Sequence, residues 1–274
     1  MATYNGEKFI EEQIRSILKQ THSHWTLYIH DDNSIDSTLN IIKQYRDRYP
    51  TKIILIEDDI CFGNPTGNFS HIITSITNTY DYYMFSDQDD YWLSSKIEDT
   101  LIKMLNISLC HSQSLMKLVH TDLIVSDSAL NIISESMWKY QKIDYRETRT
   151  EGLLAQNNVT GCTVMFDRNV KQQLFPIPKE ALMHDWWLAV NVSKYGEIGY
   201  VNRVTLYYRQ HSGNSVGAKK MDFIYYLRKI RNISKVISHY KRVYVMIQKL
   251  DFPVSFFNVM FLKFRYILRR IKDR

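Results

Sequence analysis

Residues 82–90 read Tyr-Tyr-Met-Phe-Ser-Asp-Gln-Asp-Asp, an aromatic and apolar run that ends in a cluster of acidic residues. The run over 82–85 is typical of a buried strand. The carboxylates after it would lie at the carboxyl end of that strand, where open α/β sheets bind their ligands. The same pattern occurs earlier, because a strand-like run over 25–30 stops at Asp31-Asp32-Asn33-Ser34. One such cluster would be an ordinary turn, whereas two at strand ends predict a shared site.

Helices are expected between these strands. Apolar residues at helical spacing predict helices over 9–19, 39–45, 69–76, 95–107 and 184–195. Strand-like runs cover 25–30, 52–56, 82–85, 117–125, 159–166 and 198–208. This alternation predicts an α/β fold, with a mostly parallel, Rossmann-like sheet flanked by helices.

Composition narrows the class of protein. The chain has 274 residues, of which 45% are apolar and 23% charged, so global disorder is excluded. Its three cysteines are odd in number and share no CxxC spacing, which argues against a disulfide framework or a cysteine zinc site. They favour a reducing, cytoplasmic location. No apolar stretch approaches the roughly 20 residues that a membrane-spanning helix needs.

Charge divides the chain into two parts. Residues 219–274 hold 15 Lys and Arg against 3 Asp and Glu, whereas the other 218 residues hold 20 against 26. A glycine and polar cluster over 212–217 marks the boundary. We therefore expect a catalytic or binding domain over 1–217 and a basic helical tail over 218–274.

The tail interleaves basic and aromatic residues, first over 223–231 and again over 256–271. Apolar residues at helical spacing also run from Val236 to Ile247. These patterns fit a helical subdomain packed on the catalytic domain, or amphipathic helices lying on anionic lipid. No recognised nucleic-acid-binding pattern occurs, so no nucleic-acid partner is expected.

The acidic cluster suggests metal chemistry. In an extended segment Asp87 and Asp89 point to the same side, where their like charges favour a bound cation. Oxygen ligands select a hard ion such as Mg²⁺ or Mn²⁺. The alternative is a solvated acidic turn. Because Walker A and GxGxxG loops are absent, phosphate binding would use the metal and basic side chains such as Arg209.

A second candidate site opens the predicted helix at His184-Asp185-Trp186-Trp187. Asp185 is either a favourable charge at a helix start or a general base whose pKa is raised by partial desolvation. Trp186 and Trp187 offer flat apolar surface for stacking on a sugar ring, or else pack in the core. His211 would be a metal ligand or a surface residue.

In order along the chain, five segments resemble the family 2 inverting glycosyltransferases of GT-A fold, and most of all their rhamnosyltransferase-type branch. The segments are Met1 to Gly6, Asp31 to Ser34, the DxD-containing Asp87 to Asp90, His184 to Trp187, and Arg209 to His211. The resemblance covers about residues 1–217. It implies metal-dependent sugar transfer with inversion from a nucleotide sugar.

The resemblance also implies a role for each matching residue. The nucleotide sugar would contact Ala2, Thr3, Tyr4, Asp31, Asp32, Asp87 and Arg209. Asp89 and His211 would bind the Mg²⁺ or Mn²⁺ ion, and Asp185 would be the catalytic base. The branch suggests dTDP-L-rhamnose as donor and a cell-surface glycan, often lipid-linked, as acceptor. Such an acceptor suits a position on the inner face of the plasma membrane, with contact through 218–274.

Two rival functions remain. A sugar-1-phosphate nucleotidyltransferase also uses Mg²⁺ and an α/β sheet, but its glycine-rich, basic start motif is replaced here by Thr3 to Gly6. The other rival is a peripheral membrane adaptor that binds a nucleotide sugar without turnover. The sequence does not fix the oligomeric state, so a homo-oligomer stays open.

The start of the chain departs from the family pattern. Family members carry several apolar residues before the Ala-Thr-Tyr-Asn motif, whereas here only Met1 precedes it. We therefore expect either a natural start upstream of Met1 or a short first strand.

Overall fold

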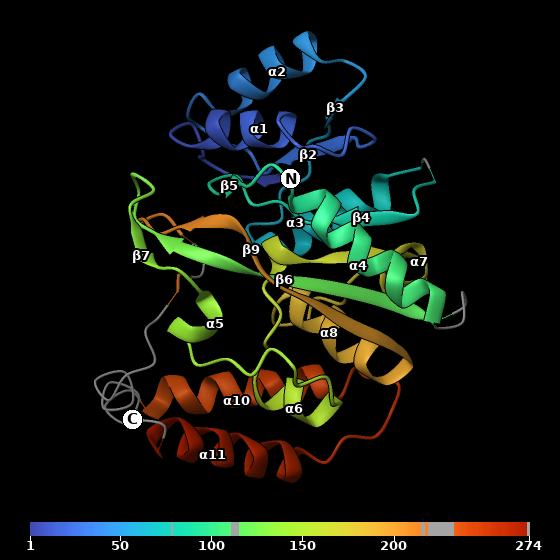
Figure 1. The fold of residues 1–274 in the computed structure, drawn as a ribbon, viewed down its shortest axis with the longest axis vertical. Helices are drawn as coiled ribbons and strands as arrows, with labels where there is room; N and C mark the ends of the chain where they lie inside the picture. The colour runs from blue at the N-terminus through green and yellow to red at the C-terminus, as the bar shows by residue number, and fades with distance from the viewer. Residues whose placement is uncertain (78, 111–114, 215–216, 219–232, 273–274) are drawn as a thin grey trace.

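The computed structural model describes residues 1–77, 79–110, 115–214, 217–218 and 233–272. It has a small sheet at one end, a larger sheet in the middle and a pair of helices at the other end (Figure 1). The helices are α1 (Ile10–Leu18), α2 (Thr38–Arg48), α3 (Pro65–Ser75), α4 (Lys96–Cys110), α5 (Met137–Tyr140), α6 (Thr150–Ala155), α7 (Arg168–Leu174), α8 (His184–Tyr195), α10 (Ile233–Ile247) and α11 (Phe256–Lys272).

The strands form two sheets. They are β1 (Ala2–Thr3), β2 (Leu27–Asp31), β3 (Ile53–Ile56), β4 (Tyr82–Met84), β5 (Tyr91–Trp92), β6 (Met116–Ser126), β7 (Ile132–Ser134), β8 (Met165–Asp167) and β9 (Gly196–Arg209). The first sheet has the order β1-β2-β3 and is parallel throughout. The second has the order β4-β8-β6-β9-β5, with β7 beside β6. Its longest ladder, between β6 and β9, is parallel, while β4, β5, β7 and β8 pair antiparallel.

Amphipathic helices cover the sheets, as the sequence predicts. In α1 the residues Ile10, Ile14 and Ile17 recur one turn apart and are buried against the first sheet. Packing rather than capping stabilises this helix, because the residue before it, Phe9, makes no side-chain capping hydrogen bond. In α3 the Asn64 side chain caps the helix by accepting from the Gly67 N–H. The mixed α/β fold class is therefore confirmed.

One predicted strand differs from the structure. The run over 159–166 is buried, but it turns through a short 3-10 helix at Gly161–Thr163 and pairs as a strand only from Met165. The prediction of a strand over the whole run is wrong, because burial in the core rather than sheet pairing explains its apolar residues. The first strand, β1, is only two residues long.

The basic tail packs on the rest of the molecule. Val243, Met246 and Ile247 of α10 and Val259 of α11 belong to the same buried cluster as residues of α3 and α8. Helices α10 and α11 thus form a hairpin whose inner face packs on the rest of the molecule (Figure 1). The predicted aromatic and basic pattern over 223–231 lies outside the described residues. Among the described helices, none is long and apolar enough to span a membrane.

Candidate active site

A cavity of about 410 Å³ opens between the two sheets and the start of α8. It collects residues that are far apart in the sequence but lie at strand and helix ends. Seven residues predicted to form the site line it: Ala2, Thr3, Tyr4, Asp32, Asp87, Asp89 and Asp185. The convergence expected of the two acidic clusters and the helix start is therefore observed.

Four carboxylates line this cavity, and those of Asp87, Asp89 and Asp185 act on one another electrostatically. Burial, followed by repulsion from Asp89 and Asp185, raises the pKa of Asp87 to about 7. Asp90 is fully buried, and the only donors beside its carboxylate among the described residues are the Cys162 thiol and the Arg209 backbone N–H, neither at full hydrogen-bond geometry. Burial and the neighbouring carboxylates raise the pKa of Asp90 as well. Such a group of carboxylates is poised to accept a cation.

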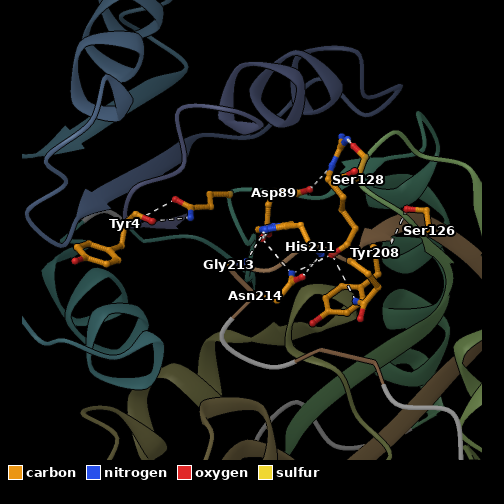
Figure 2. Close-up of polar contacts among 11 residues, drawn as sticks. Tyr4, Asp89, Ser126, Ser128, Tyr208, His211, Gly213 and Asn214 are labelled. Atoms are coloured by element: carbon orange, nitrogen blue, oxygen red, sulfur yellow. Dashed lines mark hydrogen bonds and ion pairs between the residues drawn. The ribbon is translucent and has the colours of Figure 1, made fainter.

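His211 and Asp89 meet at the edge of the cavity. His211 Nε2 lies 2.8 Å from Asp89 Oδ2, and Asn214 Nδ2 donates to the same oxygen at 3.3 Å (Figure 2). Asp87 and Asp90 also place ligand atoms close together, within 4.8 Å of one another and of Cys162. These are two neighbouring groups of donor atoms, and carboxylate oxygens and an imidazole nitrogen are both ligands that suit a divalent ion such as Mn²⁺ or Mg²⁺. The weakly compensated Asp90 carboxylate also favours a cation here.

Asp185 opens α8 at the floor of the cavity. Its Oδ2 accepts the Gly161 N–H at 2.7 Å, and its Oδ1 accepts the Trp186 N–H at 2.6 Å and the Asn157 amide at 3.3 Å. These donors fix the direction of the carboxylate. Burial raises its pKa to about 6 despite them. A fixed carboxylate with this pKa suits a general base near neutral pH.

Gly161 is required where it approaches α8. A Cβ there would lie 2.5 Å from His184 Nε2 and 3.5 Å from Asp185 Oδ2. The His184 ring cannot move aside easily, because it packs between Phe69 and Phe85 with centroid distances of 4.5 and 4.6 Å. Burial lowers the pKa of His184 to about 3, so this ring is neutral. Sequence patterns did not single out Gly161 or Asn157.

Gln88, which lies within the acidic cluster, holds the N-terminal motif in place through the backbone of Tyr4. Gln88 accepts the Tyr4 N–H at 2.9 Å and donates to the Tyr4 carbonyl at 2.8 Å (Figure 2). This pair of bonds joins the first sheet to the segment after β4. Thr3 Oγ1 donates to Asp31 at 2.7 Å, and Asp31 also accepts from the Ser34 backbone. Asp31 does not line the cavity, so the structure assigns it to this turn.

Asp32 holds the loop that follows β3 in place. Its two oxygens accept the backbone N–H groups of Phe62 and Gly63 at 2.6 and 2.8 Å. This places the loop after β3 against the cavity, which Cys61, Gly63, Asn64 and Asn68 also line. The loop was missed in the sequence, although Gly63, with a φ of +64°, signals a turn that favours glycine.

The sequence predicts that Arg209 contacts the nucleotide sugar, but its side chain does not line the cavity. It is 3% exposed, and its guanidinium donates to the carbonyls of Asp89 at 2.9 Å and Ser128 at 2.6 Å and pairs with Glu12. All three guanidinium nitrogens are therefore engaged within the protein. The structure assigns Arg209 to positioning the Asp89 backbone, in place of the predicted contact with a pyrophosphate.

Trp186 and Trp187 are not in the cavity either. Both are 7% exposed and belong to the core cluster, and Trp186 Nε1 donates to the Leu153 carbonyl at 2.7 Å. Their place on the inner side of α8 corrects the prediction that they stack on a sugar ring.

Two bacterial glycosyltransferases are similar to this chain in sequence. The chain is 31% identical over 228 residues to the dTDP-rhamnosyl transferase RfbG of Shigella flexneri, covering 80% of this chain and 74% of that protein. It is 30% identical over 223 residues to the UDP-Glc:alpha-D-GlcNAc-diphosphoundecaprenol beta-1,3-glucosyltransferase WfaP of Escherichia coli, covering 80% and 79%.

Solved structures share the fold. Residues 1–349 of S. aureus TarS in complex with UDP-GlcNAc align with a TM-score of 0.62 at 15% identity, over 98% of this chain and 70% of that one. The Pyrobaculum calidifontis mannosyltransferase PcManGT aligns with a TM-score of 0.56 at 16% identity, over 98% and 66%. The family model "Glycosyl transferase family 2" matches residues 1–172. With this fold and this acidic cavity, the chain belongs to glycosyl transferase family 2 and is a glycosyltransferase.

Proposed function

We propose that this glycosyltransferase moves a sugar from a nucleotide donor to an acceptor hydroxyl in one displacement, with inversion at the anomeric carbon. The observation that carries the proposal is that Asp185 lines the same cavity as Asp87 and Asp89. A fixed base and a group of carboxylates that favours a cation are what a single displacement requires.

In the proposed reaction Asp185 takes the proton of the acceptor hydroxyl as its oxygen attacks the anomeric carbon. The bond between that carbon and the diphosphate oxygen breaks, and its electron pair leaves with the nucleoside diphosphate. Because attack and departure occur on opposite faces, the anomeric configuration inverts. The hydrogen bonds from Gly161 and Asn157 keep the Asp185 carboxylate aimed at the incoming hydroxyl.

We propose that Asp89 and His211, with Asp87 beside them, hold a Mg²⁺ or Mn²⁺ ion. When bound, this ion would offset the negative charge of the departing diphosphate. The His211–Asp89 contact of 2.8 Å already brings the two ligand atoms together. The complex of PcManGT with GDP-Man and Mn²⁺ supports a divalent ion in this fold.

The proposed donor is dTDP-L-rhamnose, and the proposed acceptor is a lipid-linked cell-surface glycan at the inner face of the plasma membrane. The likeness to RfbG supports the donor. The name of WfaP, which includes a diphosphoundecaprenol acceptor, supports the acceptor class and also makes UDP-Glc the competing donor. Ala2, Thr3, Tyr4 and Asp32 line the cavity where a nucleoside would lie.

The test is a matched transfer assay with Mn²⁺. The protein is incubated with dTDP-L-rhamnose, UDP-Glc or UDP-GlcNAc and a synthetic GlcNAc-diphospho-lipid acceptor. We expect acceptor-dependent release of dTDP and a product of inverted configuration by NMR. Release of pyrophosphate in a parallel incubation with a nucleoside triphosphate and a sugar 1-phosphate would instead support the nucleotidyltransferase. Preference for UDP-Glc would overturn the donor, and full activity in EDTA would overturn the metal.

A further inference from the structure

Helix α11 carries two apolar faces. The inner face packs on the molecule through Val259, and the Tyr266 hydroxyl donates to Glu147 at 2.7 Å. The outer face holds Phe257, Phe261, Phe264 and Leu268, which are 80%, 55%, 58% and 43% exposed. These four residues recur about one turn apart and form one stripe, which we call the phenylalanine stripe. A contiguous exposed apolar patch on a protein surface indicates an interaction site for a protein or a membrane.

The helices around the stripe are strongly basic. Residues 233–272 contain nine Lys and Arg but one acidic residue, Asp251. Lys241 and Arg242 on α10 are exposed, and Arg265 lies beside the stripe on α11. On α10, Ile237, Tyr244 and Val245 add further exposed apolar surface. The hairpin therefore combines aromatic groups with an almost unopposed positive charge.

We propose that the outer face of the α10–α11 hairpin docks on an anionic lipid bilayer, with the phenylalanine stripe inserted among the acyl chains. The charge selects this partner, because a second copy of the same hairpin would bring positive charge against positive charge. An anionic leaflet attracts basic residues and accepts aromatic rings at its interface. The inference rests on the proposed function in one respect, namely that a lipid-linked acceptor gives the docking its purpose.

The hairpin is mounted rigidly on the catalytic unit. The His239 ring stacks on Trp186, the residue next to Asp185, at a centroid distance of 6.2 Å. Lys249 pairs with Glu180 at 3.2 Å, and Tyr195 donates to Asp251 at 3.1 Å. Docking would therefore fix the orientation of the cavity. The small sheet lies at the end of the molecule away from the hairpin and would point into the cytoplasm (Figure 1).

The test is flotation of the full chain with vesicles of phosphatidylcholine and phosphatidylglycerol. The variant F257S/F261S/F264S is compared with I102S/L109S/I132S, whose residues are similarly exposed at 53%, 86% and 54% but lie elsewhere. We expect the first variant to lose at least tenfold in partitioning and the control to float like wild type. K241Q/R242Q should lose about fivefold for each charge removed.

Three outcomes would overturn the proposal. They are wild-type protein that stays at the bottom of the gradient, a phenylalanine-stripe variant that floats normally, or equal binding to pure phosphatidylcholine. A concentration-dependent dimer in light scattering, lost in the stripe variant, would assign the face to self-association instead. Donor-induced thermal shift of each variant is measured in parallel. It separates a failed docking surface from a failed transferase site, because the stripe does not line the cavity.

Discussion

The environment of Asp185 determines both its reactivity and its cost to the fold. The ionised carboxylate is buried, and three hydrogen bonds compensate only part of its lost hydration. The folded protein therefore binds this proton more tightly than the unfolded chain does. The protonated Asp185 therefore contributes to folding stability at pH values below the pKa that it has in the unfolded chain. This contribution is lost as the pH rises through about 6, its pKa in the folded protein.

The variant Asp185→Asn should lose transfer while keeping donor binding, because the amide cannot accept the proton. Between pH 4 and pH 8 its free energy of unfolding should rise by about 1–3 kcal/mol relative to wild type, because only wild type loses stability as Asp185 ionises. Urea unfolding in EDTA at both pH values measures it. Asp127→Asn is the control: hydrogen bonds from Asn131 lower the pKa of Asp127, so that variant should not gain stability at pH 8. Turnover of Asp185→Asn at the wild-type rate would eliminate Asp185 as the base.

The pH profile of the wild-type enzyme is a separate expectation. Since the base must be ionised, kcat/KM should fall about tenfold per pH unit below about pH 6. The metal-loaded enzyme should show the fall at a lower pH, since a cation near Asp87 and Asp185 favours their ionised forms. A profile of the Mn²⁺-loaded enzyme that stays flat down to about pH 4 would speak against this assignment.

Gly161→Ala tests the close approach of the Gly161 turn to α8. The added Cβ would meet His184 at 2.5 Å, and the phenylalanine rings around His184 leave the ring little room. We expect a shift of α8 that misaims Asp185 and lowers kcat about 100-fold, with a smaller change in KM. Steady-state kinetics measure this, and circular dichroism checks that the variant folds. An unchanged kcat would mean that the turn tolerates the methyl group.

At the scale of elements, Arg209 ties three segments together. It joins the end of β9 to the Asp89 backbone, to Ser128 and to Glu12 on α1. Lysine cannot reproduce these contacts, because it lacks the planar fork of donors. The segment that presents Asp89 is thus held by a residue outside the cavity.

Arg209→Lys should therefore weaken Mn²⁺ binding by about tenfold or more, as loss of a group that orients a metal ligand does. Isothermal titration of Mn²⁺ into the apoprotein measures the change. Arg203→Lys is the matched control, since Arg203 is 65% exposed and pairs with Asp99 on the surface. Equal Mn²⁺ affinity of both variants and wild type would leave Arg209 a purely structural role.

The acidic clusters could be predicted from the sequence because they follow apolar strands directly, and the sheet brings such ends together. Asp32, Asp87, Asp89 and Asp185 all line one cavity for that reason. The partners of Arg209 could not be predicted, because Glu12 lies 197 residues away. The prediction for Trp186 is wrong because the local sequence does not show which way a side chain points. A tryptophan next to a site residue can face either the ligand or the core.

At the scale of the whole molecule, the tail is part of the core. Val243, Met246, Ile247 and Val259 are each at most 3% exposed and share one cluster with Trp186 and residues of α3. The sequence boundary near residue 217 therefore marks a change in charge rather than the end of the packing.

Truncation after residue 217 should consequently destabilise the protein rather than free an intact catalytic domain. It would uncover the side of α8 that α10 covers, and we expect a melting temperature at least 5 °C lower, or aggregation. Differential scanning fluorimetry compares this truncation with one after residue 272, which leaves the hairpin in place. A truncated protein that melts like wild type would show that the hairpin contributes no stability.

Helix α8 runs from Asp185 at the cavity to Tyr195 beside Asp251 and Phe252 of the tail. The twelve residues of α8, His184–Tyr195, span about 18 Å, so this helix links the proposed base to the helices of the tail. A drug-like molecule that separated the stacked rings of Trp186 and His239 should tilt α8. Such a compound would inhibit sugar transfer without resembling a nucleotide, and so would not compete with the donor.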